Sequence, residues 1–174
     1  MLCREDYWTV SAALANTMAP KLEYVFTLNV DLAPPVDYGS TSTGDRRFIP
    51  ITGGTFSGPK LSGRILPGGG DWNNVRSDGV VHVYAKYSIQ ADDGTIISIT
   101  NEGYGRSSQD EMKGVFASDY NGAPDASSEW YTKTWPRFDV EAGKHEWLGK
   151  SCFLGELLRP DRPGHVKIEV YEIL

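Results

Sequence analysis

The sequence has few of the residues that build metal sites or disulfide frameworks. It contains two cysteines and three histidines in 174 residues. Cys3 lies in a terminal segment and Cys152 in a predicted strand, so we expect two reduced thiols and no framework of the kind that staples small secreted domains. His82, His145 and His165 are far apart and follow no metal-binding spacing, so no metal site is predicted.

Motifs that bind nucleotides or activate a serine are also absent. There is no G-x-S-x-G elbow, and the glycine run 68–70 leads into Asp71 and Trp72 instead of the Lys-Ser/Thr of a phosphate loop. The sequence Gly103-Tyr104-Gly105 has no second strand–helix unit behind it, so it is not a dinucleotide fingerprint. No cofactor is therefore predicted. The net charge of −6 argues against nucleic acid as a partner, because phosphate neutralisation needs clustered Lys and Arg.

No apolar run is long enough to span a membrane as a helix, and the first residues do not resemble a signal peptide, since Glu5 and Asp6 follow the lone Arg4. A more strand-like sequence begins at Met18. We expect a cytoplasmic protein without a membrane partner. Its N-terminal arm, residues 1–17, is flexible or packs on a neighbouring copy, and residues 18–174 form a single domain.

Alternating apolar and polar residues predict an all-β protein. Residues 22–32 alternate with a period of two, which is typical of a half-buried strand. The turn Asp92-Asp93-Gly94 indicates the clearest hairpin. A loop is predicted at 33–46, and strands are predicted at 22–32, 47–56, 60–66, 80–90, 95–104, 130–140, 146–157 and 166–173.

About eight strands without a βαβ rhythm predict a single antiparallel β-barrel, with a sandwich as the alternative. The glycine-rich segment 53–79 predicts sharp bends at the barrel rim. Ser108 and Glu111 form a capping box that predicts one short helix between strands, either a lid over the barrel or a surface crossover. A barrel of this size has room for side chains or one small ligand.

The predicted strand 80–90 has one apolar and one polar face, and the polar face allows two interpretations. It either faces solvent or lines a polar pocket, in which desolvation would lower the pKa of Lys86 and make it a base. The apolar face comprises Val81, Val83, Ala85, Tyr87 and Ile89, and the polar face comprises His82, Tyr84, Lys86, Ser88 and Gln90.

Two other groups of residues are open to both a structural and a functional interpretation. Asp71 or Asp78 is a general base held by Arg76, or Arg76 only stabilises the loop. Tyr131, Lys133, Trp135 and Arg137 share one strand face, with Trp147 in the next predicted strand. They either clamp a flat, oxygen-rich ligand or are exposed strand residues.

Six sequence segments resemble the small β-barrel family catalogued as domain of unknown function 3237, over about residues 20–173. They are GGTFSGPKLSGRILPGGGDW, RSDG with the following strand and AKY, DDGTIISITNEG, YTKTWPRFD, HEWLGKSCFLG and VKIEVYEI. The resemblance implies an antiparallel barrel that assembles as a homo-oligomer, with pocket residues at Asp71, Trp72, Arg76, Asp78, Tyr87, Arg106, Phe138 and Trp147. The chain departs from the commoner pattern at Lys86 and Lys133, where arginine is typical, and at Gly149, where asparagine is typical. A lysine cannot make the planar two-point contact of arginine.

Some fungal members of that family resemble cofactor-free enzymes that close an oxygen heterocycle on an aromatic polyketide. The first hypothesis is therefore a cyclase or isomerase that uses acid–base catalysis for hydroalkoxylation-like C–O ring closure of a small phenolic substrate in the barrel. The alternatives are a non-catalytic small-molecule carrier and an interaction module with a filled interior. The candidate proton-transfer groups are Asp71, Asp78, Lys86 and Glu102, and the candidate substrate-binding residues are Trp72, Arg76, Tyr84, Arg106, Lys133, Trp135, Phe138 and Trp147.

Overall fold

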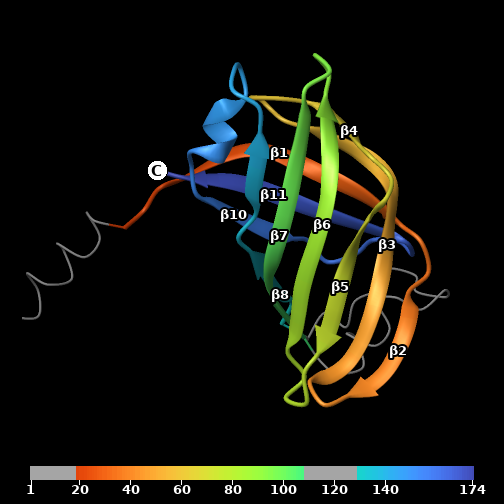
Figure 1. Ribbon diagram of the computed structural model, residues 1–174. Coiled ribbons are helices and arrows are strands. Elements are labelled where there is room, and N and C mark those ends of the chain that lie inside the picture. The colour runs from red at the N-terminus through yellow and green to blue at the C-terminus, as the bar shows by residue number, and fades with distance from the viewer. Residues whose placement is uncertain (1–18, 108–128) are drawn as a thin grey trace, which may run out of the picture.

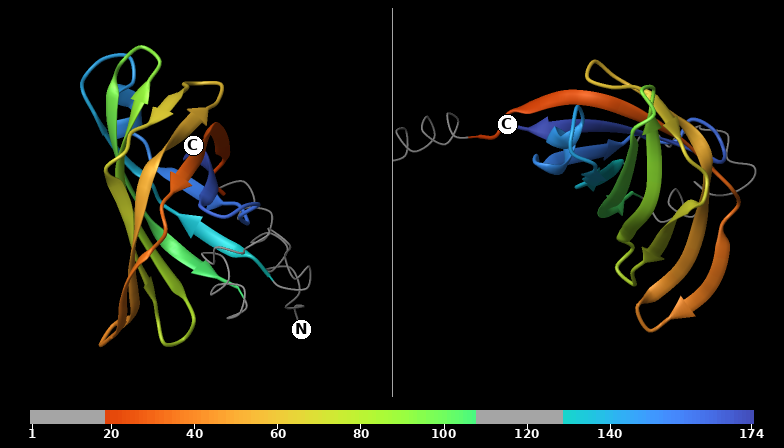
Figure 2. Two further views of the ribbon diagram at one scale, coloured as in Figure 1. Left: turned by 90° about the vertical axis from the view of Figure 1, so that its right-hand side faces the viewer. Right: turned by 45° about the horizontal axis from the view of Figure 1, so that its top comes forward.

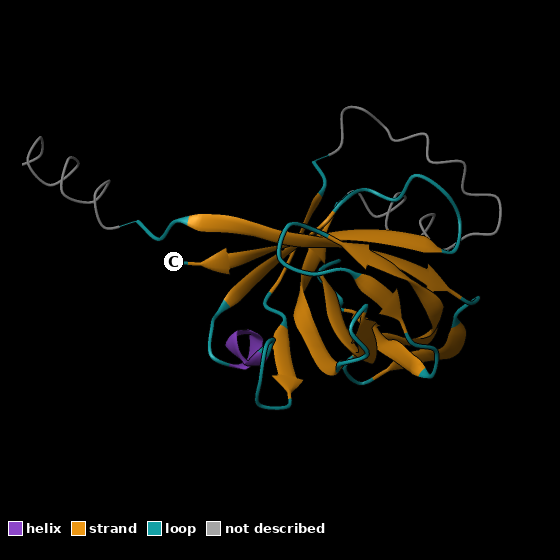
Figure 3. Cartoon of the chain, turned by 90° about the horizontal axis from the view of Figure 1, so that it is seen from above, coloured by secondary structure: helices purple, strands orange, loops and turns teal. Residues whose placement is uncertain are grey.

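The structure, a computed structural model, describes residues 19–107 and 129–174 (Figure 1). The expected arm at 1–17 and the expected helix starting at 108 lie outside the described residues. Within the described residues, strands are almost the only regular element (Figure 3), and no described helix is long and apolar enough to cross a membrane. The elements are β1 (Leu22–Leu32), β2 (Val36–Thr41), β3 (Gly44–Ser57), β4 (Gly63–Ile65), β5 (Gly69–Val75), β6 (Val81–Ala91), β7 (Ile96–Arg106), β8 (Tyr131–Thr134), β9 (Arg137–Val140), the 3-10 helix η1 (Glu146–Gly149), β10 (Phe153–Leu157) and β11 (His165–Ile173).

The strands form one antiparallel sheet that closes on itself, which confirms the predicted β-barrel. Eight strands make the closed ring, in the order β6-β5-β3-β1-β11-β10-β8-β7, and the pairing of β6 with β7 completes it. The remaining strands are attached to this ring: β4 pairs with β3 and β6, β2 pairs with β3, and β9 pairs with β7 beyond β8. Closure is visible as the strong curvature of the sheet (Figure 2).

Several element boundaries differ from the sequence prediction. The predicted loop at 33–46 contains β2 and the start of β3. β3 begins at Gly44, whose φ of 126° favours glycine and where an added Cβ would clash with the Val75 carbonyl oxygen. β5 was not predicted as a strand, because its glycines hide the alternation. The predicted strand 130–140 is interrupted at Trp135 and Pro136, and 146–149 is a 3-10 helix instead of strand.

One end of the barrel is filled by aromatic side chains. Phe26 contacts Phe56 and Phe138 edge-on, with ring centroids 5.5 and 5.9 Å apart, and Phe138 contacts Phe153 at 4.9 Å. All four rings are buried, and they belong to the same hydrophobic cluster as Leu148 of η1. The end that holds η1 and β4 (Figure 1) is therefore closed by packing, and any space for a ligand lies toward the β5–β6 turn.

Candidate functional site: a cavity with one buried carboxyl

A cavity of about 70 Å³ lies inside the barrel. Its wall is mostly aliphatic, with Val30, Ile49, Val83 and Ile168 among the lining residues. Five polar side chains interrupt this apolar lining, and they lie on four successive strands of the barrel wall. They are Asp71 and Asn73 of β5, Tyr87 of β6, Asn101 of β7 and Thr132 of β8.

The apolar face of β6 turns toward the interior. Val83, Ala85 and Tyr87 are buried and line the cavity. The intervening Tyr84 and Lys86 are not among the lining residues, and Lys86 is exposed. The solvent-facing interpretation of the polar face is therefore the one that the structure bears out, as expected for a half-buried strand with a period of two.

The Asp71 carboxylate is held between β5 and β6. Its Oδ1 accepts the backbone N–H of Tyr84 at 2.8 Å, and its Oδ2 accepts the side-chain N–H of Asn73 at 3.2 Å. The residue pairing of the two strands is interrupted at this point, between Asp71↔Ala85 and Asn74↔His82. The carboxylate thus satisfies a strand N–H while it lines the cavity.

Burial decides the proton affinity of Asp71. Desolvation raises the pKa of Asp71 above its ordinary value, and it outweighs the two hydrogen bonds and the nearby His82, which lower the pKa. A carboxyl group with a raised pKa exchanges protons closer to neutral pH than an exposed one, and such groups are typical of acid–base sites.

The other polar groups of the cavity have no hydrogen-bond partner in the part of the chain that the structure describes. They are the Oδ1 atoms of Asn73 and Asn101, the Tyr87 hydroxyl and the Thr132 hydroxyl. All four residues are less than a tenth exposed. Burial raises the pKa of the Tyr87 hydroxyl, so it stays protonated and can donate. Buried groups of this kind are normally paired, so this set points to a guest.

The predicted proton-transfer groups other than Asp71 lie away from the cavity. Asp78 pairs with Arg76 in the exposed β5–β6 turn, where it also accepts the Val80 N–H. Glu102 lies 3.0 Å from His82 Nε2 and 3.5 Å from Arg137. Asp78 and Glu102, with the residues they contact, are not among the lining residues. The Lys86 ammonium lies 5.4 Å from the Tyr84 ring centroid, outside the barrel.

The predicted substrate-binding residues are dispersed over the molecule. Trp72 packs on Phe48, and Trp135 on Tyr104, with centroid distances of 5.0 and 5.7 Å; both tryptophans are more than a third exposed. Lys133 pairs with Glu156, Arg106 stacks 4.0 Å from the Tyr131 ring, and Tyr84 contributes only its backbone to the site. Phe138 belongs to the aromatic cluster, and Trp147 lies beside Phe153. The structure does not bring these residues together with Asp71.

Sequence reasoning missed Asn73, Asn101 and Thr132, whereas the family resemblance implied Tyr87. A usable signal exists for Asn101, because it continues the inward series Ile97, Ile99 of β7 as the first polar member. A polar residue on the buried face of a strand needs a partner or a role. No comparable signal marks Asn73, which follows the glycine run in a strand that the sequence did not reveal.

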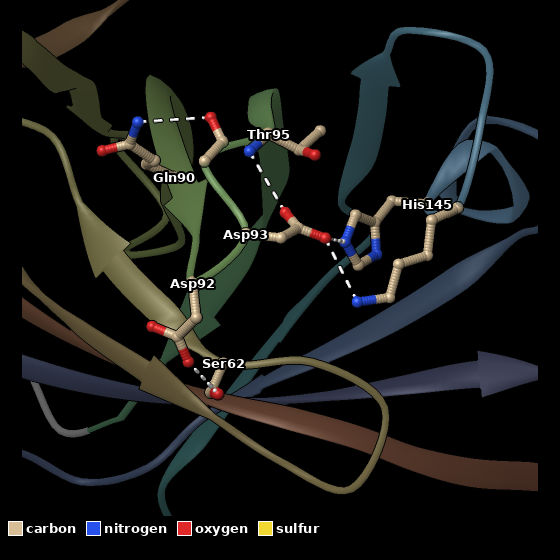
Figure 4. A network of polar contacts seen from close by, with 8 residues as sticks. Ser62, Gln90, Asp92, Asp93, Thr95 and His145 are labelled. Carbon is tan, nitrogen blue, oxygen red and sulfur yellow. Dashed lines mark hydrogen bonds and ion pairs between the residues drawn. The ribbon is translucent and has the colours of Figure 1, made fainter.

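A second polar cluster lies near the packed end of the barrel, at the β6–β7 turn (Figure 4). The Asp93 carboxylate contacts His145 Nε2 at 2.8 Å and Lys144 Nζ at 3.2 Å, and it accepts the Thr95 backbone N–H. The hydrogen bond from His145, followed by that from Thr95, holds the pKa of Asp93 well below its ordinary value. This cluster fastens the turn to the segment before η1. The described residues contain no group of three or more His, Cys, Asp or Glu side chains arranged to hold a metal ion.

Sequence comparison identifies relatives over nearly the whole chain. The sequence matches the family described as "Protein of unknown function (DUF3237)" over residues 20–173. A UPF0311 protein of Rhodopseudomonas palustris is 31% identical over 159 residues, which cover 90% of this chain and 100% of the relative. The hydroalkoxylation enzyme phnH of Penicillium herquei is 29% identical over 93 residues, which cover 53% of this chain and 62% of the enzyme.

Solved structures share the barrel. A β-barrel-like protein from Acinetobacter baumannii aligns with a TM-score of 0.76 and 34% identity, over 90% of this chain and 97% of the other. An enzyme from Penicillium herquei aligns with a TM-score of 0.65 and 22% identity, over 89% and 95% of the two chains. At that identity the second alignment concerns the fold alone.

Proposed function

The chain belongs to the DUF3237 family, and we propose that it is a cofactor-independent cyclase, an acid–base catalyst that closes an oxygen ring on a small phenolic substrate inside the barrel. The observation that carries this proposal is the partly buried Asp71 carboxyl, which lines a mostly aliphatic cavity and has a raised pKa. The distant relationship to a hydroalkoxylation enzyme supports the choice of reaction.

Hydroalkoxylation requires little chemical apparatus. The phenol loses its O–H proton, the oxygen forms a bond to one alkene carbon, and the other alkene carbon gains a proton, so the atoms of the substrate are all retained. The Asp71 carboxylate can take the first proton and return it as a carboxylic acid. Its raised pKa lies closer to that of a phenol, about 10, which reduces the uphill part of the transfer.

The size of the cavity limits how a substrate enters. A volume of about 70 Å³ is below the roughly 150 Å³ of an apolar cavity that holds benzene and the roughly 300 Å³ at which small-molecule pockets begin. Trp130 and Leu158 line the cavity and are only partly buried, so they mark its boundary with the surface. The proposal therefore includes movement of these side chains when a ring enters.

The test uses the purified full chain and a phenol with an ortho allyl or prenyl substituent, with product followed by chiral chromatography. Asp71→Asn is expected to lower the rate about 100-fold or more, the usual contribution of a positioned acid–base group. Asp78→Asn is the matched control, because it removes a carboxylate from an exposed turn, and it should retain activity. Product that forms no faster and no more enantioselectively than in buffer contradicts the proposal.

A carrier without turnover is the second candidate function. It is favoured by the two hydrogen bonds of Asp71, which suit a carboxylate that fixes the strands as well as one that reacts. A carrier would bind the same phenols, and Asp71→Asn would change their affinity with no product in either protein. Detection of wild-type turnover excludes this alternative.

A further inference from the structure

The polar side chains that line the cavity, among the residues the structure describes, lie on one wall in a defined pattern. Asp71 and Asn101 are both paired with Ala85, one from each neighbouring strand, so the three form a row across β5, β6 and β7. Two strand spacings separate the ends of this row by about 10 Å. The small Ala85 side chain between them leaves room for a guest that contacts both ends.

The chemistry of these atoms determines what they can bind. The amide nitrogen of Asn73 donates to the Asp71 carboxylate, so its unpartnered atom is the oxygen, which only accepts hydrogen bonds. The unpartnered Asn101 atom is also an amide oxygen, while Tyr87 and Thr132 offer hydroxyls. The two amide oxygens only accept, whereas the hydroxyls both donate and accept, so a guest that satisfies all four atoms must carry hydrogen-bond donors.

The part of the lining that the structure describes offers no positive charge to a guest. No Lys, Arg or His side chain is among the described residues that line the cavity, and Asp71 is its one carboxyl group. Arg159 lies 5.9 Å from the Trp130 ring, outside the lining. An anion that entered would lose its hydration without gaining a counter-charge, which is costly in an apolar site.

We infer that the cavity recognises an uncharged aromatic ring bearing two hydroxyl groups, held by acceptors at both ends of the Asp71–Ala85–Asn101 row, and that it rejects anionic rings. This inference rests on the proposed function only in taking the same cavity as the substrate site. It adds the substrate class, a neutral dihydroxyarene, and it assigns Asn73, Asn101, Tyr87 and Thr132 as specificity-determining residues.

The experiment is an NMR titration of the full chain with four single-ring probes. Resorcinol is expected to bind roughly tenfold or more tightly than 1,3-dimethoxybenzene, which has the same ring and no donors, because unmet buried acceptors penalise the second probe. The anion 3-hydroxybenzoate should bind more weakly than resorcinol. The cation 3-hydroxybenzylammonium should also bind more weakly, because its ammonium loses its hydration in a mostly apolar cavity whose one described carboxyl already accepts two hydrogen bonds. Equal affinity of resorcinol and its dimethyl ether, or tighter binding of either charged probe, overturns the inference.

Variants locate the effect in the named row. Asn101→Leu should abolish the preference for resorcinol over its dimethyl ether. Thr132→Val keeps the volume of the side chain nearly unchanged and should reduce the same preference, so it serves as the test if Asn101→Leu does not fold. Ala85→Val should weaken both probes by filling the space between the two ends. Ala91→Val is the matched control, because Ala91 is buried but does not line the cavity.

The outcomes separate this inference from the proposed function. Selective binding of resorcinol without ring closure of any allyl phenol would remove the catalytic role and leave the recognition intact. Ring closure by a protein that does not distinguish resorcinol from its dimethyl ether would support the catalytic role and contradict the proposed recognition. A preference for resorcinol that survives both Asn101→Leu and Thr132→Val would place recognition elsewhere and overturn the assignment.

Discussion

Asp71 has both a structural role in the barrel and a proposed chemical role in the cavity. Its carboxylate accepts a strand N–H from Tyr84 and faces a cavity with aliphatic walls. Hydrogen bonds to the ionised form lower the pKa of Asp71, while burial raises it, and burial is the larger effect. Asp71 therefore costs the folded state some free energy when it is ionised, and groups with such perturbed pKa values are common at functional sites.

Stability should depend on pH through this residue. Because the pKa of Asp71 is raised in the folded state above an unfolded value of about 3.9, its contribution to stability is fully present below that value. It is lost as the pH rises through the folded pKa. Relative to Asp71→Asn, the free energy of unfolding of the wild type should fall between pH 4 and pH 8, measured by urea denaturation at several pH values. If the free energy of unfolding of the wild type, relative to Asp71→Asn, is constant or grows with pH, the pKa of Asp71 is not raised in the folded state.

From the sequence, Asp71 was one of four candidate proton-transfer groups and the family resemblance implied Tyr87, but the other polar residues of the cavity were missed. Lys86 and Glu102 were candidates because polar residues can line a pocket, yet both lie on strand faces that alternate with buried aliphatic residues, and they point outward. The direction of a strand face follows from the period of two. The groups that surround an inward-facing asparagine come from strands far apart in the sequence, so the sequence alone does not indicate them.

At the scale of elements, the β6–β7 hairpin is both the clearest sequence prediction and the strand pair that closes the barrel. Its turn is fastened by Asp93, which meets the buried His145 from beyond β9 (Figure 4). The turn itself was predictable from Asp-Asp-Gly. The contact with His145 was not, because it joins residues about fifty positions apart, and the sequence indicated a strand close by, where the 3-10 helix η1 lies.

Loss of this contact should loosen the hairpin. His145→Ala is expected to lower the Tm at pH 7 by on the order of 5 °C, since it leaves the Asp93 carboxylate without its main partner. The pKa of Asp93 is lowered in the folded state, so the stabilisation is present above the unfolded value of about 3.9 and is lost as the pH falls further. The difference in Tm, measured by circular dichroism, should therefore be smaller at pH 3 than at pH 7.

Lys144→Ala provides the matched control. Lys144 contacts the same carboxylate oxygen as His145, but its side chain is 75% exposed, and exposed ion pairs contribute little. It should leave the Tm within about 1 °C of the wild type. A loss as large as that of His145→Ala would mean that charge, and not the buried hydrogen bond, fastens the turn.

The whole molecule is divided into a packed end and a hollow end. The aromatic cluster fills the barrel beside η1, and the polar groups without described partners surround the cavity. A domain has only about 5–15 kcal/mol of net stability, so each buried polar group without a partner is a noticeable cost. Strand number and closure could be predicted from the sequence, whereas this division could not, because it depends on which side chains meet across the closed ring.

If these polar groups are kept for a guest, their removal should stabilise the free protein. Tyr87→Phe and Thr132→Val preserve shape and delete a hydroxyl that has no partner among the described residues. Each should raise the free energy of unfolding by about 1 kcal/mol and the Tm by about 2–4 °C. Tyr171→Phe is the matched control, because the Tyr171 hydroxyl donates to Glu169 at 2.6 Å, and it should not stabilise. If both cavity variants lose stability in thermal and urea unfolding, the hydroxyls are structural, and the hollow end is not built around a guest.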